Sequence, residues 1–348
     1  MMPDYGAFIT ALKTIGYNDG TRDNRAHHLA RLFNVNDAID SAAFSSDVRL
    51  ALRPFIDSGV LLERDGRVES TVRVVPFRGY YFVVDSPKLY RHQHDRYSYV
   101  GGDGLYLCDF VVERLTTHDV STQRCLDLCA GSAVMGIALS PHFKNIICTD
   151  IHPPAVEWAR VNQSINDCDN VEVVQGSLYD GLEGPFSVII ANPSYSIFPD
   201  EFAKTENLLE YEMGGGKYGL ELTMDIIAGF DDYLTPKGDG FICTNDPIVR
   251  GRDLLAELLE ETYAAKDYAF EIHYVTRCRT KDRSLQRFHK DLGIDRIYFV
   301  ILVVKKDQPF SIQYFHLPLW TELEQWARFK FSDHWAYRQA RRLLKRSA

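Results

Sequence analysis

The sequence predicts an α/β protein with an open, doubly wound sheet, preceded by a small unit of helices and a β-hairpin. Two patterns support this prediction. Beyond Pro87, short β-rich apolar runs alternate with segments of helical periodicity, which is typical of βαβ units. Before that point, apolar residues recur at helical spacing and are then followed by β-type runs. The chain has 348 residues, enough for two domains that each have a core.

Composition narrows the class of protein. With 45% hydrophobic and 25% charged residues, the chain is globular rather than fibrous or disordered. No apolar run approaches the roughly 18 residues of a membrane span, and the start lacks the pattern of a secretory signal, so we expect a cytoplasmic protein with no membrane partner. The seven cysteines include no CxxC pair, which predicts reduced thiols and no zinc site.

Residues 1–85 are predicted to form a winged-helix-like domain. Helical spacing covers residues 8–15, 29–33 and 48–56, and β-type runs follow at 60–62, 68–75 and 80–84. Acidic and basic residues nearly balance here, and no predicted recognition helix carries clustered Lys or Arg. We therefore expect a scaffold or a substrate lid rather than a DNA-binding domain.

Residues 86–308 are predicted to hold the sheet. Seven strands are expected, at 124–128, 145–149, 171–174, 186–191, 240–244, 268–275 and 296–304. Residues 309–348 show helical spacing again and are expected to form a helical C-terminal extension that ends in a basic helix.

The first strand of the sheet leads into a candidate ligand-binding turn. Asp127 stands near the end of this strand, and the small residues of 129–133 precede a helix; open sheets bind ligands at this edge. The next strand ends at Asp150, some twenty residues on, where a carboxylate can bind both hydroxyls of a ribose. Cys129 and Ala133 replace two glycines of the GxGxxG pattern, so a nucleoside cofactor without a pyrophosphate fits better than NAD.

At these residues the sequence resembles the class I S-adenosylmethionine (SAM)-dependent methyltransferases. Residues 127–133 match their first motif, and Asp150 matches their ribose-binding acid. The resemblance implies a Rossmann-like seven-stranded sheet and S-adenosyl-L-methionine as the cofactor. Ser177 stands where the family often has Asp. The implied cofactor-binding residues are Tyr99, Asp103, Asp127, Cys129, Ala130, Gly131, Asp150, Ile151, Ser177, Leu178 and Asn192.

A second motif follows the apolar strand at 186–191. Asn192, Pro193, Ser194 and Tyr195 resemble the NPPY motif of amino-group methyltransferases, with Ser194 in place of the second proline. In that family the Asn side-chain carbonyl and a backbone carbonyl accept hydrogen bonds from the target NH₂, while the aromatic ring stacks on its planar carrier. The resemblance therefore implies that these four residues are catalytic, and that rate comes from positioning rather than from a general base.

Two further segments extend the resemblance. Residues 210–222 are similar to the GG-x-x-GL segment of the protein-glutamine methyltransferases, whose glycines would shape a loop beside the acceptor pocket. Residues 234–238 look like the L-x-P-x-G turn before the next strand. The resemblance covers about residues 99–304 and does not extend to the first 85.

These motifs predict a SAM-dependent N-methyltransferase that acts on a small molecule or a peptide. An RNA or DNA base and a protein glutamine are alternative acceptors, and a non-catalytic SAM-binding regulator with a DNA-binding winged helix is the alternative of another class. No metal is expected, because His92 and His94 have no further ligands at a recognisable spacing. The sequence predicts no particular oligomeric state.

Two basic stretches, at 277–290 and 328–346, keep a nucleic-acid partner open. The net charge of −9 nevertheless favours a small acceptor. We expect the first stretch to be a flexible insertion bordering the acceptor pocket. The pocket would then be closed from the other side by the segment before Asp85, and residues near Tyr211 would complete it.

Overall fold

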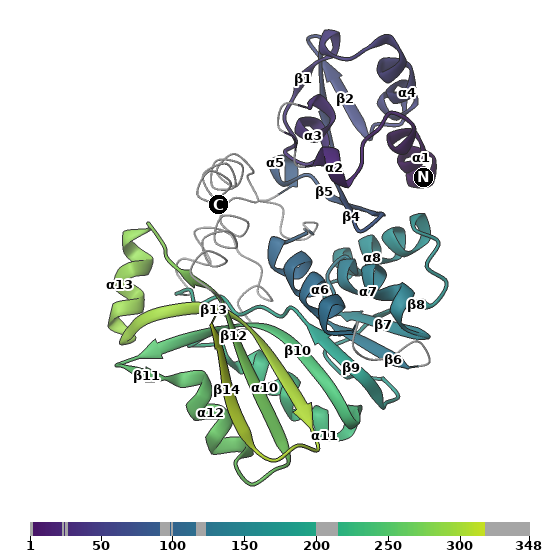
Figure 1. Cartoon of the computed structure of the whole chain (residues 1–348). Coiled ribbons are helices and arrows are strands. Elements are labelled where there is room, and N and C mark those ends of the chain that lie inside the picture. The colour runs from purple at the N-terminus through teal and green to yellow at the C-terminus, as the bar shows by residue number, and fades with distance from the viewer. Residues whose placement is uncertain are drawn as a thin grey trace, which may run out of the picture.

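The computed structural model describes residues 3–22, 24, 27–90, 98, 100–115, 123–199 and 215–316. Within them, an N-terminal unit stands on a larger α/β unit, and a two-stranded hairpin lies between the two (Figure 1). A helical extension was expected at 309–348, but its described part, Ser311–His316, is an edge strand of the main sheet; the rest of the extension lies outside the described residues. None of the helices in the described ranges is long and apolar enough to cross a membrane.

The N-terminal unit contains the three helices that were predicted and a small antiparallel sheet of strand order β1-β3-β2. Asp4 caps the first helix by accepting a hydrogen bond from Ala7 N at 2.9 Å. Phe8, Phe33 and Leu52 are buried in its core. The elements are α1 (Tyr5–Thr14), α2 (Asp19–Arg22), α3 (His28–Phe33), β1 (Ile39–Asp40), η1 (Ser41–Ala43), α4 (Ser46–Asp57), β2 (Leu61–Arg64) and β3 (Arg67–Ser70).

The hairpin of β4 (Val72–Phe77) and β5 (Tyr80–Asp85) belongs to two cores at once. The β-type run expected at 68–75 is therefore divided, because β3 and β4 lie in different sheets. Alternate side chains of a strand point to opposite faces. Val83 is buried in the core of the N-terminal unit, whereas Phe82 and Val84 are buried against the α/β unit.

The main sheet has the strand order β14-β12-β13-β10-β9-β6-β7-β8. Strands β8, β7, β6, β9 and β10 are parallel, and β13 is antiparallel to both β10 and β12. All seven predicted strands are present; β11 and the parallel edge strand β14 were not predicted. The strands are β6 (Arg124–Leu128), β7 (Asn145–Asp150), β8 (Val171–Gln175), β9 (Phe186–Ala191), β10 (Leu234–Val249), β11 (Arg252–Asp253), β12 (Tyr268–Cys278), β13 (Ile294–Lys306) and β14 (Ser311–His316).

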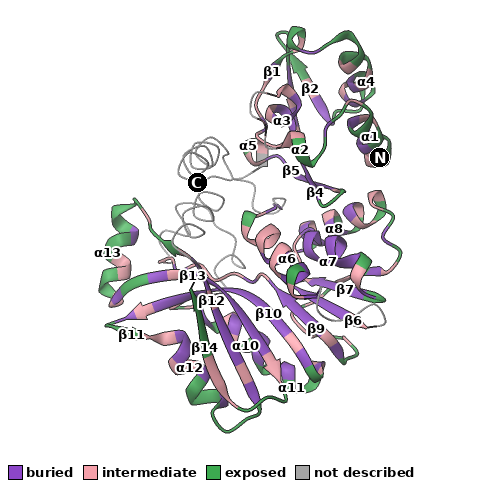
Figure 2. Cartoon of the chain, in the orientation of Figure 1, coloured by how far each residue is buried: buried purple, intermediate pink, exposed green. Residues whose placement is uncertain are grey.

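Helices cover both faces of this sheet, and its central strands β6, β9, β10 and β13 are buried along most of their length, whereas the edge strands β8 and β14 are largely exposed or half-buried (Figure 2). One face packs against α6 (Gly102–Leu115), α7 (Val134–Leu139) and α8 (Pro153–Ile165), with η2 (Ser140–His142) after α7 and α5 (Pro87–Tyr90) after the hairpin. The other face packs against α10 (Glu221–Ala228), α11 (Phe230–Tyr233) and α12 (Leu254–Tyr263). The remaining helix, α13 (Arg283–Asp291), joins β12 to β13.

The strand order reverses at β6, because β7 and β8 lie to one side of it and β9 and β10 to the other. In open α/β sheets, ligands bind outside the carboxyl ends of the strands at such a switch point. The fold therefore places the candidate site where β6, β7 and β9 end.

Candidate functional site

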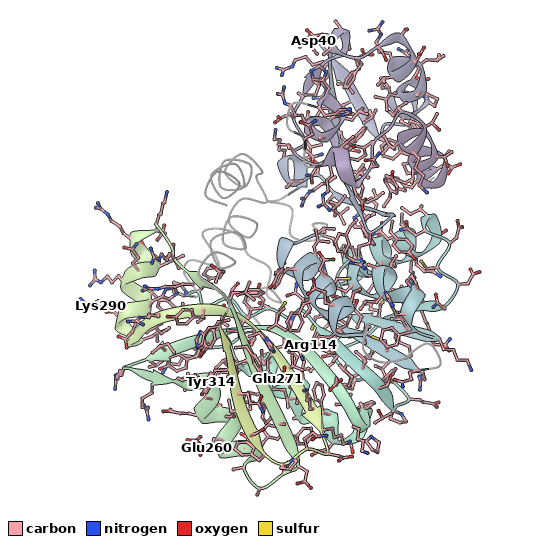
Figure 3. The ribbon with its side chains drawn as sticks, viewed as in Figure 1. Asp40, Arg114, Glu260, Glu271, Lys290 and Tyr314 are labelled. Carbon is pink, nitrogen blue, oxygen red and sulfur yellow. The ribbon has the colours of Figure 1, made fainter. Side chains whose placement is uncertain are left out.

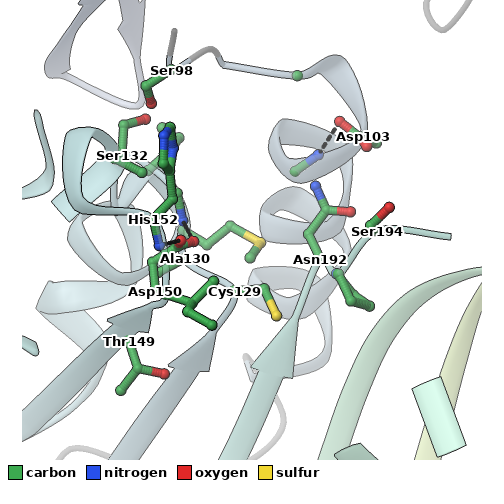
Figure 4. Close-up of a pocket in the computed structure, with 18 of the residues that line it drawn as sticks. Ser98, Asp103, Cys129, Ala130, Ser132, Thr149, Asp150, His152, Asn192 and Ser194 are labelled. Carbon is green, nitrogen blue, oxygen red and sulfur yellow. Dashed lines mark hydrogen bonds between the residues drawn. The ribbon is translucent and has the colours of Figure 1, made fainter. Parts of the chain in front are cut away.

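A cavity of about 450 Å³ lies at this switch point (Figure 4). Its wall combines the start of α6, the turn after β6, the end of β7 and the turn after β9. Most of the residues predicted to be functional line it: Asp103, Cys129, Ala130, Gly131, Asp150, Ile151, Ser177, Leu178, Asn192, Pro193, Ser194 and Tyr195. Tyr99 lies outside the described residues.

The turn after β6 has the left-handed backbone conformation of a glycine-rich loop, although Cys129 and Ala133 stand at two of the glycine positions. Gly131 has a φ of 55°, and Cys129 and Ala133 also have positive φ values, of 53° and 60°. A left-handed backbone costs an L-residue roughly 1–2 kcal/mol, which explains why the family usually has glycine at these two positions. Ala130 N donates to Thr149 O at 2.9 Å and ties the turn to β7.

Asp150 is held at the cavity wall by two backbone donors. Its Oδ2 accepts from Gly131 N at 2.7 Å, and its Oδ1 accepts from His152 N at 2.8 Å. Burial raises the pKa of this carboxyl, while the backbone hydrogen bonds act in the opposite direction. Each carboxylate oxygen has two lone pairs, so the group can accept further hydrogen bonds from ligand hydroxyls.

Asp127 does not line the cavity, which corrects the prediction that it binds the cofactor. Its side chain is fully buried, and its Oδ2 accepts from Gly136 N at 2.8 Å. Strand β6 continues to Leu128, so the side chain of Asp127 faces the first turns of α7 rather than the strand end. Burial raises its pKa to about 8. In this position Asp127 fixes α7 against the sheet.

Asn192 presents an unused acceptor to the cavity. Among the described residues, its Oδ1 is buried and has no hydrogen-bond partner. The Oγ of Ser132, also in the cavity wall, is likewise buried without a hydrogen-bond partner among the described residues. A buried polar atom without a partner costs about 1–3 kcal/mol, so a ligand that forms a hydrogen bond with either atom would be stabilised in this cavity.

Tyr195 is tied to the start of α6, a contact that the sequence did not predict. Its hydroxyl donates to Asp103 Oδ2 at 2.7 Å, and its ring lies 5.6 Å from that of Phe299 at an angle of 45°. Asp103 therefore joins α6 to the turn that was expected to bind the acceptor.

Gly215 and Gly219, from the segment expected to shape a loop beside the acceptor pocket, lie very close to the backbone of the Asn-Pro-Ser-Tyr turn. A Cβ on Gly215 would lie 3.0 Å from Tyr195 Cα, and one on Gly219 would lie inside 3.0 Å of Tyr195 O. Only glycine allows this close backbone approach. Asn245 adds a hydrogen bond, with Nδ2 donating to Tyr195 O at 2.8 Å. Sequence reasoning missed Asn245; its only signal was a polar residue directly after an apolar strand.

The N-terminal unit supports the cavity from behind and does not line it. In the described part of the chain, the cavity wall begins at Ser98, so the prediction that the segment before Asp85 closes the pocket is wrong. Asp85 instead accepts hydrogen bonds from Ser98 N and Trp158 Nε1, both at 2.9 Å. Tyr211 lies outside the described residues, as do His92 and His94.

The strand order, the cavity at the switch point and the Asn-Pro-Ser-Tyr turn after β9 define a Rossmann-like methyltransferase domain. Residues 107–208 match the family model "Methyltransferase small domain". The chain thus carries a class I methyltransferase domain of the SAM-dependent type, in agreement with the resemblance found in its motifs.

Three relatives are similar to the chain over this domain. The ribosomal protein uL3 glutamine methyltransferase of Neisseria gonorrhoeae is 31% identical over 35% of this chain and 42% of its own. The release factor glutamine methyltransferase of Thermodesulfovibrio yellowstonii is 32% identical over 38% of this chain and 50% of its own length. A protein N5-glutamine methyltransferase of Methanocaldococcus jannaschii is 31% identical over 34% and 60%. The chain thus spans about half the length of these relatives.

Two solved structures are distantly similar in fold. The 16S rRNA N2 G1207 methyltransferase of T. thermophilus has a TM-score of 0.41 and 16% identity, over 71% of this chain and 57% of its own. The ribosomal protein L11 methylase of Lactobacillus delbrueckii subsp. bulgaricus has a TM-score of 0.38 and 17% identity, over 61% and 81%.

Proposed function

We propose that the protein transfers a methyl group from SAM to the nitrogen of a planar amino group. One observation carries this proposal: a buried side-chain carbonyl with no partner, Asn192 Oδ1, lines the same cavity as the carboxylate of Asp150. The cavity thereby offers an acceptor for an N–H group and a carboxylate for ribose hydroxyls. Its turn has no glycine pattern for a pyrophosphate, which fits a cofactor without phosphates.

The residues of the chain can supply what this reaction needs. Bound SAM would provide an electrophilic methyl group on its sulfonium and would leave as S-adenosylhomocysteine, while the methylated nitrogen would release one proton to solvent. Asp150 would hold the ribose, and Asn192 Oδ1 would accept a hydrogen bond from the target NH₂ and so orient its lone pair. Tyr195, fixed through Asp103, would limit where the planar carrier can lie. Positioning of this kind supplies rate without a general base.

The acceptor that we favour is a carboxamide in a peptide. The names of the relatives, which state glutamine methylation of ribosomal proteins and release factors, support this choice. A glutamine side chain presents a planar NH₂ group, which can donate a hydrogen bond to Asn192 Oδ1, an atom without a partner among the described residues. We also propose that the enzyme works in the cytoplasm, where such proteins are made.

The first 85 residues are proposed to be a winged-helix-like domain. The sheet order β1-β3-β2 with α4 before β2 supports this assignment. Because this domain carries Asp85 and so supports Ser98 and Trp158, we assign it a scaffolding role for residues 86–308. The extension at 309–348 is proposed to be helical beyond the described residues.

Calorimetric titration tests the cofactor, and transfer of labelled methyl from SAM tests the acceptor. The expected results are binding of both SAM and S-adenosylhomocysteine, and label on glutamine-containing peptides but not on the same peptides with glutamate in place of glutamine. Failure to bind either nucleoside would refute the proposal. Binding without label on peptides, metabolite extract or RNA would favour the non-catalytic regulator.

A further inference from the structure

The segment between the last two antiparallel strands of the sheet is an ordered, strongly basic arm. We define the basic arm as residues 277–296, which include the end of β12, all of α13 and the start of β13. It was expected to be a flexible insertion, but nine of its residues form α13. Asp282 caps this helix by accepting from Ser284 N at 2.8 Å and Leu285 N at 2.9 Å.

One face of α13 packs against the body of the protein beside the cavity. Leu285 is buried, and Phe288 and Leu292 pack against the apolar cluster that contains Ile197. Ile197 O also contacts His289 Nε2 at 2.9 Å. Ile197 lies between Ser196 and Phe198, which both line the cavity. The arm is therefore a fixed neighbour of the acceptor turn.

The opposite face of α13 is a row of cations. Arg283, Arg287 and Lys290 are spaced i, i+4 and i+7, so they share one side of the helix. All three are exposed, and Lys290 projects away from the sheet (Figure 3). Leu285, at a different angle on the helix, is buried.

The arm concentrates positive charge in an acidic protein. It holds seven cations and three acids, although the chain carries a net charge of −9. Asp282 and Asp295 are used for backbone hydrogen bonds. Within the described ranges, Arg287 is the one cation of the seven in an ion pair, at 4.0 Å from Asp291 with 86% of its side chain exposed. A pair so exposed contributes little, so the face is available to an anion.

We propose that the basic arm binds the phosphate backbone of single-stranded RNA beside the acceptor site. Five of the seven cations are arginines, whose planar guanidinium groups match phosphate oxygens. The surface is one helix wide, which suits a single strand better than a duplex, and most single strands in a cell are RNA. Tyr218 packs against the apolar cluster that also contacts the arm, and Phe198 lines the cavity, so the arm and the acceptor site are neighbours on the surface.

The proposal is tested on the full chain with a fluorescently labelled oligouridylate and anisotropy at several salt concentrations. The variant combines R283Q, R287Q and K290Q, because glutamine keeps helix propensity and removes three charges. The matched control combines K144Q, R160Q and K237Q, three exposed cations outside the arm. Each single-stranded phosphate contact contributes about −0.7 to the slope of log K against log salt.

The arm variant should bind RNA about tenfold or more weakly near 0.1 M salt, with a salt slope smaller by about 2, and the control should stay within about twofold of wild type. Equal losses in both variants, no binding by the wild type, or equal competition by polyglutamate or duplex DNA would overturn the proposal. Calorimetry with SAM distinguishes failure of the RNA-binding proposal from failure of the methyltransferase proposal, because both variants should retain the SAM affinity of the wild type. Loss of RNA binding with intact SAM binding supports the arm's role whatever the methyl acceptor is.

Discussion

Replacing Gly219 by alanine should displace the acceptor turn while leaving the protein folded. A Cβ at this position would lie inside 3.0 Å of Tyr195 O and 3.0 Å from Ile197 Cγ1. Restoring ordinary contact requires the turn to move by roughly 1 Å, which would also disturb the hydrogen bond from Asn245. A misplacement of about 1 Å can cost about 100-fold in a reaction that depends on positioning. We therefore expect methyl transfer to fall by about 100-fold.

Gly59→Ala is the matched control for Gly219→Ala. Both glycines have a left-handed backbone, with φ of 81° at Gly59 and 76° at Gly219, but nothing lies within 4 Å of a Cβ on Gly59. Both variants should lose about 1–2 kcal/mol of unfolding free energy from backbone strain. Single-turnover transfer at saturating SAM should fall only in the Gly219 variant, with SAM affinity unchanged. Full activity in that variant, or an equal loss in the control, would refute the reasoning.

Three other substitutions test the site and its electrostatics. Asn192→Ala should reduce turnover by about 100-fold or more with SAM affinity within a few-fold, and a variant that loses SAM binding but keeps turnover would reverse the assignment. Asp150→Ala should weaken SAM binding by about 1.5–3 kcal/mol in calorimetry; unchanged affinity would exclude a ribose contact. Asp246 is fully buried, and burial raises its pKa from 3.8 to about 7, so the folded state retains a proton that the unfolded state releases. The free energy of unfolding should thus fall as the pH rises from about 4 to about 7, and in urea titrations Asp246→Asn should reduce this fall.

The sheet was predictable because each of its seven strands carries a local apolar pattern that ends at a turn. The same reasoning placed Asp150 at the cavity, since it stands at the last position of β7. It failed for Asp127 although the predicted strand at 124–128 has the observed bounds, because the side chain of Asp127 lies on the face of β6 that packs against α7. Successive side chains of a strand point to opposite faces, so a position near a strand end does not by itself place a side chain at the ligand edge.

Contacts between distant segments had no local pattern from which to be predicted. Tyr195 and Asp103 are 92 residues apart in the chain, and the Asn245 contact depends on the register of β10 beside the turn after β9. Helix α13 was missed because its charged residues were interpreted as a loop. The spacing of Leu285, Phe288 and Leu292 in fact follows a helical face.

The hairpin of β4 and β5 couples the folding of the N-terminal unit to that of the α/β unit. Asn162 Oδ1, on α8, accepts from Val83 N at 2.7 Å. Asn166, the C-cap of α8, accepts from Tyr81 N and donates to Tyr81 O, so side chains of the other unit satisfy the free edge of β5. A chain cut at residue 85 would expose the apolar surface that Phe82 covers. The two units should consequently melt in one cooperative transition, and a destabilising substitution in the core around Val83 should reduce the fraction of molecules with an intact cavity.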